Sequence, residues 1–169
     1  AKTQRPGVCN AMETLLVHEK IADRFLPKLL KKLDSEDVEI RGCPKTKDLF
    51  SKALEATLGD YYTEHLDKIL SVKVVPTHEK AISHIEEHGT HHTEAILAKD
   101  LKVIETFQKR VDASCIVVNA STRFNDGGEL GLGAELGIAT TKLHSYGPMG
   151  AREITATRFI VKGEGHTRG

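Results

Sequence analysis

The stretch TLLVHEKIADRFLPKLLKKLDSEDVEIRG, residues 14–42, shows the pattern that decides the fold of this chain. It begins with a short apolar, strand-like run at 14–18. Residues 21–33 follow, in which apolar side chains recur every four positions, as on one face of a helix. Residues 38–42 return to the alternation of a strand. A strand, a helix and a second strand in this order predict two parallel strands joined by a helix that packs on their sheet.

The same alternation continues through most of the chain. The sequence predicts further helices at 47–59, 77–88 and 100–111, and further strands at 69–75, 94–98 and 114–119. Thr77 is expected to cap its helix and Gly89 to end it. Strands separated by helices of this length predict an α/β domain over residues 1–140, with three layers (α/β/α) and a mostly parallel sheet. Sheets of this kind bind ligands at the carboxyl ends of their strands.

The last part of the chain breaks this pattern. Residues 120–151 are rich in glycine, and loops of this length are usually functional or belong to another domain. EITATRFIVKG, residues 153–163, predicts one more strand with no helix after it. Because a lone strand needs a partner, we expect residues 141–169 to form a return segment and a strand that pairs with another subunit of a homo-oligomer.

Charge and composition exclude several classes of protein. Lys and Arg total 24 and so do Asp and Glu, and no polybasic run occurs, so we expect no nucleic-acid or membrane partner. No apolar run approaches the roughly 20 residues of a membrane helix, and no signal peptide opens the chain. The odd number of cysteines, without CxxC spacing, favours a reducing cytoplasm over a disulfide framework. The first methionine is Met12, which suggests a fragment of a longer protein.

Cys9, in RPGVCNAMETLLV, has two interpretations. If residues 10–13 form a helical turn, the free N–H groups of that turn favour the thiolate and are able to hold an oxyanion, as in a catalytic nucleophile. The spacing alone favours a buried structural cysteine. Cys43 and Cys115 lack such a setting, and Cys115 is expected to pack in the core.

The other candidate motifs are less specific. His84 and His88, in HIEEHGTHH, share a helical face, but no acidic or cysteine ligand joins them, so a solvated helix end is favoured and no metal site is expected. The glycines of GELGLGAELG miss the dinucleotide fingerprint because Leu136 stands at the third glycine position, which leaves an anion-binding nest or a structural loop. Arg123 follows a predicted strand and fits an anionic substrate and a surface salt bridge equally well.

Taken together, several segments resemble the gamma-glutamyl phosphate reductase family of the aldehyde dehydrogenase superfamily, in its bacterial form. They are RPGVCNAMETLLV, TEHLDKILSVKVV, EHGTHHTEAI, VNASTRFNDGGELGLGAELGIATTKLH and GPMG. The resemblance runs in order along essentially the whole chain, but it covers only the C-terminal part of the family's chain and not its N-terminal NADPH-binding domain. It implies an aldehyde-dehydrogenase-like catalytic domain with a C-terminal oligomerisation strand.

The resemblance also implies an activity and its residues. The family reduces L-glutamyl 5-phosphate with NADPH to L-glutamate 5-semialdehyde and phosphate, in proline biosynthesis, through a thioester on a cysteine that Cys9 matches. Asn10 borders that cysteine, and Glu64 falls where the superfamily has a glutamate that touches the nicotinamide ribose. Two segments match family motifs and supply candidate substrate-binding residues, namely His92, Thr93, Asn119, Ser121, Thr122 and Arg123. Two positions depart from the family: Tyr146 replaces an arginine, and His65 stands where tyrosine is more usual.

Two other functions stay open. A Cys-His hydrolase or acyltransferase would pair Cys9 with a histidine, for instance His92. A non-catalytic assembly module would dock its terminal strand on another subunit. Consumption of NADPH by the complete chain separates a reductase from both, whereas the fragment alone is expected to be inactive.

Overall fold

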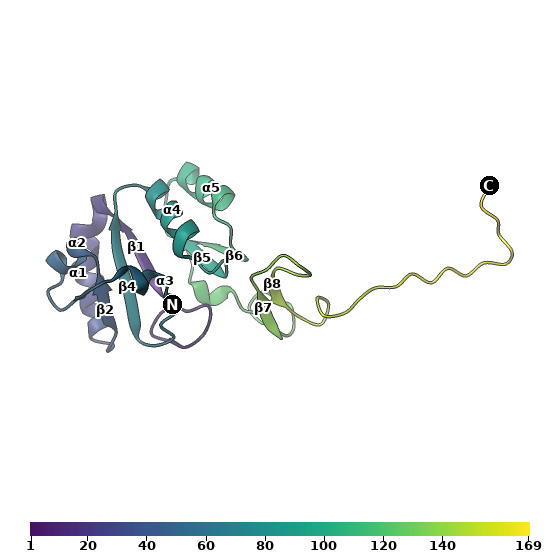
Figure 1. Cartoon of the computed structure of the whole chain (residues 1–169), viewed down its shortest axis with the longest axis horizontal. Helices are drawn as coiled ribbons and strands as arrows, with labels where there is room; N and C mark the ends of the chain where they lie inside the picture. Colours follow the sequence, from purple (N-terminus) through teal and green to yellow (C-terminus); the bar gives the residue numbers. More distant parts are fainter.

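The computed structural model describes all 169 residues and has a parallel sheet at its centre (Figure 1). The strands of this sheet, in the spatial order β1-β4-β2-β3, are β1 (Thr14–His18), β4 (Ile69–Val75), β2 (Glu39–Gly42) and β3 (Leu54–Glu55). The helices are α1 (Glu19–Asp34), α2 (Pro44–Leu49), α3 (Leu58–Tyr62), α4 (His78–His88) and α5 (Leu101–Arg110). Every neighbouring pair of strands is parallel, which confirms the predicted α/β class.

Helices cover both faces of this sheet. On β4, Leu70 and Val72 belong to a cluster of buried apolar residues that also contains the inward face of α1. The alternate positions, Ser71 and Lys73, face the opposite way. The Ser71 hydroxyl donates to the Asp60 carbonyl of α3, and Lys73 Nζ lies 3.2 Å from a histidine ring nitrogen of α4. Because neighbouring side chains on a strand point to opposite faces, the sheet is the middle of three layers.

Two smaller sheets follow along the chain. In the first, β5 (Thr93–Ile96) and β6 (Cys115–Val118) are parallel, and α4 and α5 pack on them through a small apolar cluster. In the second, β7 (Gly137–Ala139) and β8 (Gly147–Met149) form an antiparallel pair that the sequence did not predict. The predicted domain boundary at residue 140 falls in the connection between these two strands. No helix of the chain combines the length and apolar character that crossing a membrane requires.

The single helix predicted at 47–59 is wrong. α2 has Pro44 in its first turn and ends at Leu49, and β3 follows before α3 begins. The start of α3 is a capping box, in which Thr57 and Asp60 each bind the backbone N–H of the other. Proline at a helix start and Thr-x-x-Asp are two separate signals for a helix beginning, so this segment contains two short helices.

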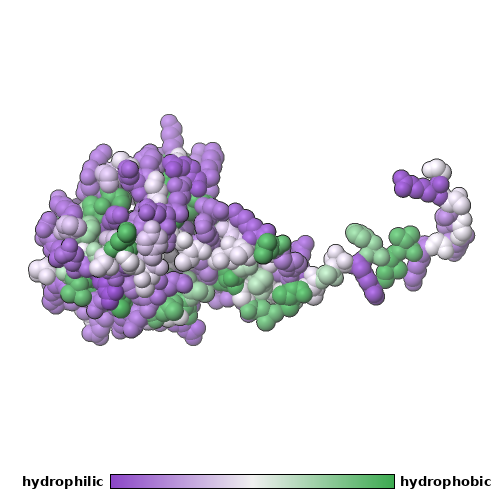
Figure 2. Space-filling model, viewed as in Figure 1, coloured by the Kyte–Doolittle hydropathy of each residue, from purple (hydrophilic) through white to green (hydrophobic).

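The strand predicted at 153–163 is not present within the chain. Residues 151–154 form a turn, and the residues after it have neither helix nor strand. They extend away from the rest of the molecule (Figure 1). A strand is held by hydrogen bonds from a neighbouring strand, and none lies beside this segment. Its apolar side chains are exposed, with Phe159 at 97% and Val161 at 92% (Figure 2).

Candidate active site

The candidate residues Cys9, Glu64 and His92 all lie just before strands. Cys9 is exposed in the loop that leads into β1, and Glu64 lies in the loop that leads into β4, the parallel neighbour of β1. His92 directly precedes β5. The two parallel sheets therefore present these groups at the amino ends of their strands, not at the carboxyl ends that the general rule predicts. At its carboxyl end β1 runs directly into α1, which leaves no loop there to carry a site.

Two carboxylates from other loops influence the Cys9 thiol. Burial raises the pKa of Cys9, and the carboxylates of Glu135 and Glu64 raise it further, while the backbone N–H groups of Cys9 and Asn10 oppose the rise. The same carboxylates act on His92, whose pKa is nevertheless lowered because burial outweighs them. Both carboxylates therefore lie within electrostatic range of the thiol and of the imidazole. Glu135 was not among the residues predicted from the sequence.

The predicted helical turn after Cys9 is wrong. The Ala11 N–H donates to the Val8 carbonyl at 2.9 Å, which closes a tight turn, and the chain then enters β1. The first helix begins only at Glu19. Without a helix N-terminus at Cys9, the backbone N–H groups of Cys9 and Asn10 do not outweigh burial and the two carboxylates, so the pKa of this thiol is raised and not lowered as expected.

Cys43 has the setting that was expected for Cys9. It is the residue that caps α2, at the carboxyl end of β2. Its sulfur accepts the Val74 N–H at 3.3 Å and lies 3.4 Å from the Thr46 hydroxyl. Although burial raises the pKa of Cys43, the hydrogen bonds from Thr46 and Val74 lower it below its ordinary value. Cys115 is half-buried, and burial raises its pKa.

Asn10 joins the loop before β1 to a distant segment of the chain. Its Nδ2 donates to the Asn125 carbonyl at 2.9 Å, and its Oδ1 accepts a hydrogen bond from Arg123 Nη1. Its own carbonyl accepts the Thr122 hydroxyl at 2.6 Å. Asn10 is only 4% exposed. The predicted Asn10, Thr122 and Arg123 therefore come together, and they fix the residue next to the candidate nucleophile.

Asn125 links this segment to His92 and was missed by the sequence reasoning. It is completely buried, and its Nδ2 donates to Thr93 Oγ1 at 2.8 Å. Thr93 Oγ1 in turn lies 2.6 Å from His92 Nδ1. The other ring nitrogen of His92, Nε2, is buried and has no partner. Nothing in the sequence around Asn125 distinguishes a buried amide from the polar residue of a turn.

The remaining candidates divide into two groups. Ser121 and Arg123 line an open pocket of about 310 Å³, together with Gln4, Phe124, Asp126 and Glu129. Arg123 makes its one side-chain hydrogen bond to an amide and not to a carboxylate, and its Nε has no partner. Asn119 binds the backbone N–H and carbonyl of Ala98 with its side chain, at the carboxyl end of β5 and thus away from His92. The structure gives Asn119 the role of joining strand ends.

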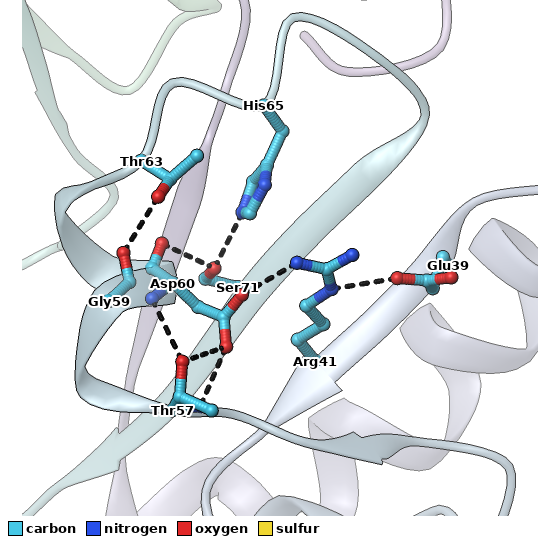
Figure 3. Close-up of polar contacts among 8 residues, drawn as sticks. All are labelled: Glu39, Arg41, Thr57, Gly59, Asp60, Thr63, His65 and Ser71. Carbon is cyan, nitrogen blue, oxygen red and sulfur yellow. Dashed lines mark hydrogen bonds and ion pairs between the residues drawn. The ribbon is translucent and has the colours of Figure 1, made fainter.

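A polar network beneath the sheet supports the loop before β4 (Figure 3). The Arg41 guanidinium donates to the Asp60 carboxylate at 2.7 Å. Burial raises the pKa of Asp60, but hydrogen bonds from Arg41 and Thr57 outweigh burial and hold this pKa at about 2. His65 Nε2 lies 3.0 Å from the Ser71 hydroxyl, which donates to the Asp60 carbonyl. These residues are not a catalytic triad, because Ser71 is completely buried and its proton is already committed.

His84 and His88 are not the solvated helix end that the sequence favoured. Their rings stack with centroids 4.1 Å apart, and His84 also meets the edge of Tyr61. Burial, with the charge of Lys73, lowers the pKa of His84 to about 4. No group of three metal-ligating side chains gathers there or elsewhere in the chain. The His84 ring of α4 therefore packs as a neutral group against α3, with the His88 ring stacked on it.

The chain is similar over nearly its whole length to known proteins. No family model matches the chain. The gamma-glutamyl phosphate reductase of Dictyoglomus thermophilum is 54% identical over 168 residues, which is 99% of this chain and 40% of that protein. The crystal structure of gamma-glutamyl phosphate reductase from Thermotoga maritima matches with a TM-score of 0.93 and 49% identity, over 99% of this chain and 41% of that one.

A more distant structure shows the fold. The acetylating aldehyde dehydrogenase from Geobacillus thermoglucosidasius has a TM-score of 0.55 and 24% identity, over 76% of this chain and 37% of that one. The fold is therefore aldehyde-dehydrogenase-like, as the resemblance implied. The chain spans about two fifths of the length of the curated relatives that it matches.

Proposed function

Because this chain is homologous over its whole length to gamma-glutamyl phosphate reductases, we propose that it forms the nucleophile-bearing part of such an enzyme. The reaction is the NADPH-dependent reduction of L-glutamyl 5-phosphate to L-glutamate 5-semialdehyde and phosphate, in proline biosynthesis. The 54% identity over 168 residues carries the proposal. The exposed position of Cys9, within electrostatic range of Glu64 and Glu135, supports it, because a merely structural cysteine is usually buried.

Cys9 supplies the covalent chemistry of the proposal. Its thiolate attacks the acyl carbon, the bond from carbon to the phosphate oxygen breaks, and phosphate leaves with the electron pair, so that a thioester remains. When bound, NADPH supplies the hydride that reduces this thioester. The resulting oxyanion collapses, the carbon–sulfur bond breaks, and the semialdehyde leaves while Cys9 returns to the thiolate. The N–H groups of Cys9 and Asn10, which face the sulfur, are suited to stabilise the oxyanion.

The carboxylates near Cys9 fit a ligand that carries hydroxyl groups. Glu64 is exposed, and a carboxylate accepts hydrogen bonds from the hydroxyls of a ribose. Such bonds stabilise the negative charge of Glu64 and weaken its effect on the pKa of Cys9. We assign Glu64 to the nicotinamide ribose because the resemblance implies this role and the exposed carboxylate fits it. We place the main NADPH-binding domain in the part of the reductase that this chain does not span.

Arg123 and its neighbours are proposed to bind the substrate. Its Nε is unpartnered, and its guanidinium lies in the same pocket as Ser121. A guanidinium with free donors suits an anionic group, here a carboxylate or phosphate of glutamyl phosphate. His92, Thr93 and Thr122 complete the proposed contacts around Cys9. Asn119 is not assigned to the substrate, because its side chain is hydrogen-bonded to the backbone of Ala98.

The test uses a full-length reductase that contains this segment. L-Glutamate 5-semialdehyde and NADP⁺ are supplied with and without phosphate, and NADPH is measured by its absorbance. We expect NADPH to form in a phosphate-dependent reaction that Cys9→Ala abolishes. Release of phosphate from an acyl phosphate without use of NADPH would instead support the Cys-His hydrolase, and no turnover of either kind would support an assembly module.

The C-terminal segment is proposed to assemble the enzyme. Residues 153–162 expose apolar side chains and have no neighbouring strand in this chain, which suits addition to the sheet of another subunit of a homo-oligomer. We place the enzyme in the cytoplasm, where its three free cysteines stay reduced.

A further inference from the structure

Asn125 is a buried amide whose position the chemistry of Cys9 does not explain. It is completely buried, and it contacts the two halves of the site at once. Its carbonyl accepts the Asn10 side chain, next to Cys9, and its own side chain reaches Thr93, next to His92. A buried polar side chain in this place has a strong effect on the groups that it binds, because no water is available to replace it.

The orientation of the Asn125 amide follows from its neighbours. Its Nδ2 lies 2.8 Å from Thr93 Oγ1 and 3.5 Å from the His92 carbonyl oxygen. A carbonyl oxygen only accepts hydrogen bonds, so an amide oxygen in that position would face it with repulsion. The NH₂ group therefore points at Thr93 and the His92 carbonyl, and Asn125 is a donor to the threonine hydroxyl.

This hydrogen bond also determines which atom donates in the contact between Thr93 and the His92 ring. Thr93 Oγ1 accepts from Asn125, and its own proton is free to donate to the only other close partner, His92 Nδ1, at 2.6 Å. A neutral imidazole has one N–H and one bare nitrogen. If Nδ1 accepts, the proton must be on Nε2. This nitrogen is buried without a partner, in a side chain that is only 8% exposed.

We propose that Asn125 is a positioning residue: through Thr93 it holds His92 as the Nε2–H tautomer, so that His92 donates a hydrogen bond to an acceptor oxygen of the substrate and cannot take the proton of Cys9. The identity of that oxygen, on the acyl phosphate, rests on the proposed function. Burial keeps His92 neutral by lowering its pKa, as a tautomer requires. An unpartnered buried N–H is costly, and a substrate oxygen removes that cost.

The tautomer is measured directly by nuclear magnetic resonance. Long-range ¹H–¹⁵N correlations of the histidine rings are recorded on the ¹⁵N-labelled chain at neutral pH, and His92→Gln identifies the signals of His92. We expect Nε2 to show the shift of a protonated ring nitrogen and Nδ1 that of a bare one. A His92 ring protonated at Nδ1 in the unmodified chain would overturn the proposal.

Asn125→Asp reverses the donor direction with almost no change of shape. The carboxylate accepts from the Thr93 hydroxyl, which must then accept from His92, so the proton moves to Nδ1. We expect Nδ1 of His92 to show the ¹⁵N shift of a protonated ring nitrogen and Nε2 that of a bare one. A folded Asn125→Asp chain that keeps the Nε2–H tautomer would show that Asn125 does not control the ring.

Thr93 provides a second test that does not depend on whether Asn125→Asp folds. Thr93→Val removes the hydroxyl at nearly constant volume, and we expect both tautomers of His92 to become populated. Thr93→Ser keeps the hydroxyl and should retain Nε2–H. An unchanged tautomer in Thr93→Val would exclude the relay.

Turnover separates this proposal from the proposed function. In the full-length reductase, Asn125→Asp should lower kcat about tenfold or more, the loss of one hydrogen bond, while KM for NADPH stays unchanged. An unmodified full-length enzyme that reduces no acyl phosphate refutes the proposed function, whereas the tautomer of His92 is still decided by its ¹⁵N shifts. Normal kcat in an Asn125→Asp enzyme whose ring has changed tautomer would refute the role of His92 as donor.

Discussion

Cys9 and Cys43 lie at opposite ends of the same parallel sheet, and their surroundings differ in kind. Cys43, at the carboxyl end of β2, has a pKa that hydrogen bonds from its immediate surroundings lower against the effect of burial. Cys9, at the amino end of β1, has a pKa raised by burial and by two carboxylates. Yet carboxylates from two distant loops influence Cys9. A lowered thiol pKa can come from local hydrogen bonds alone, whereas a site for a substrate needs groups from several parts of the chain.

The largest expected difference between the two ends is in catalysis. In a full-length reductase, Cys9→Ala should lower the rate of reduction by about four orders of magnitude or more, because no nucleophile remains. Cys43→Ala should leave turnover nearly unchanged. Both variants are compared by NADPH formation under the same conditions. If Cys43→Ala lost activity and Cys9→Ala kept it, the active site would lie at the other end of the sheet.

The network around Asp60 supports the amino end and should contribute measurably to stability. The pKa of Asp60 is about 2, below its ordinary value of 3.8, so its carboxylate stabilises the fold above about pH 4 and loses this effect as the pH falls toward 2. Asp60→Asn should therefore lower the free energy of unfolding by about 2 kcal/mol at neutral pH. Urea unfolding measures this loss, and the difference between the two chains should shrink in acid.

Glu39→Gln is the matched control for Asp60→Asn. Glu39 also binds the Arg41 guanidinium, at 2.7 Å, but its side chain is 40% exposed. An exposed ion pair is worth little, so this variant should change the free energy of unfolding by less than about 0.5 kcal/mol. Equal effects of the two substitutions would show that burial does not distinguish the partners of Arg41.

The sequence predicts the elements whose signals are local, such as a continuous apolar run or a helix cap. The apolar runs gave β1 and β4 with the bounds that the structure has, because parallel strands joined by helices bury continuous apolar surface. Thr77 does cap α4, and Gly89 does end it. The segment at 47–59 failed because two helix beginnings and a short strand lie within the length of one ordinary helix. The strand at 153–163 failed because no strand of the chain lies beside this segment to hold it by hydrogen bonds.

The sequence identified only those residues of the candidate site that belong to a recognisable motif. The resemblance selected Cys9, Asn10 and Arg123, and the structure brings these together. Glu135 and Asn125 were missed because their importance depends on contacts with residues more than thirty positions away, which no local pattern records. The pKa of Cys9 was predicted in the wrong direction, since it is raised by burial and by carboxylates from two other loops.

A smaller effect should separate the two thiols by their ionisation. The rate of alkylation by iodoacetamide, followed for each cysteine by peptide mass spectrometry over a pH series, should rise to its midpoint at a higher pH for Cys9 than for Cys43. Glu135→Gln and Glu64→Gln should each move the Cys9 midpoint to lower pH, because they remove a negative charge. Neither should move that of Cys43, and a shift there would mean that the two ends are coupled.

The smallest effect on stability is expected from the C-terminal segment, which belongs to neither end. No apolar residue after Val117 is buried, so deletion of 155–169 should change the free energy of unfolding by less than about 0.5 kcal/mol. The same deletion in a full-length reductase should reduce its mass in solution, as measured by sedimentation. An unchanged mass would remove the proposed role of this segment in assembly.

The central claim, that Cys9 carries the acyl group, is tested most directly by trapping that group. A full-length reductase is mixed with L-glutamate 5-semialdehyde and NADP⁺ without phosphate, digested, and examined by mass spectrometry for a glutamyl thioester that hydroxylamine removes. We predict one glutamyl group on the peptide that contains Cys9, released when phosphate is added and absent in Cys9→Ala. A glutamyl group on the Cys43 peptide, or one that persists in Cys9→Ala, would contradict the account.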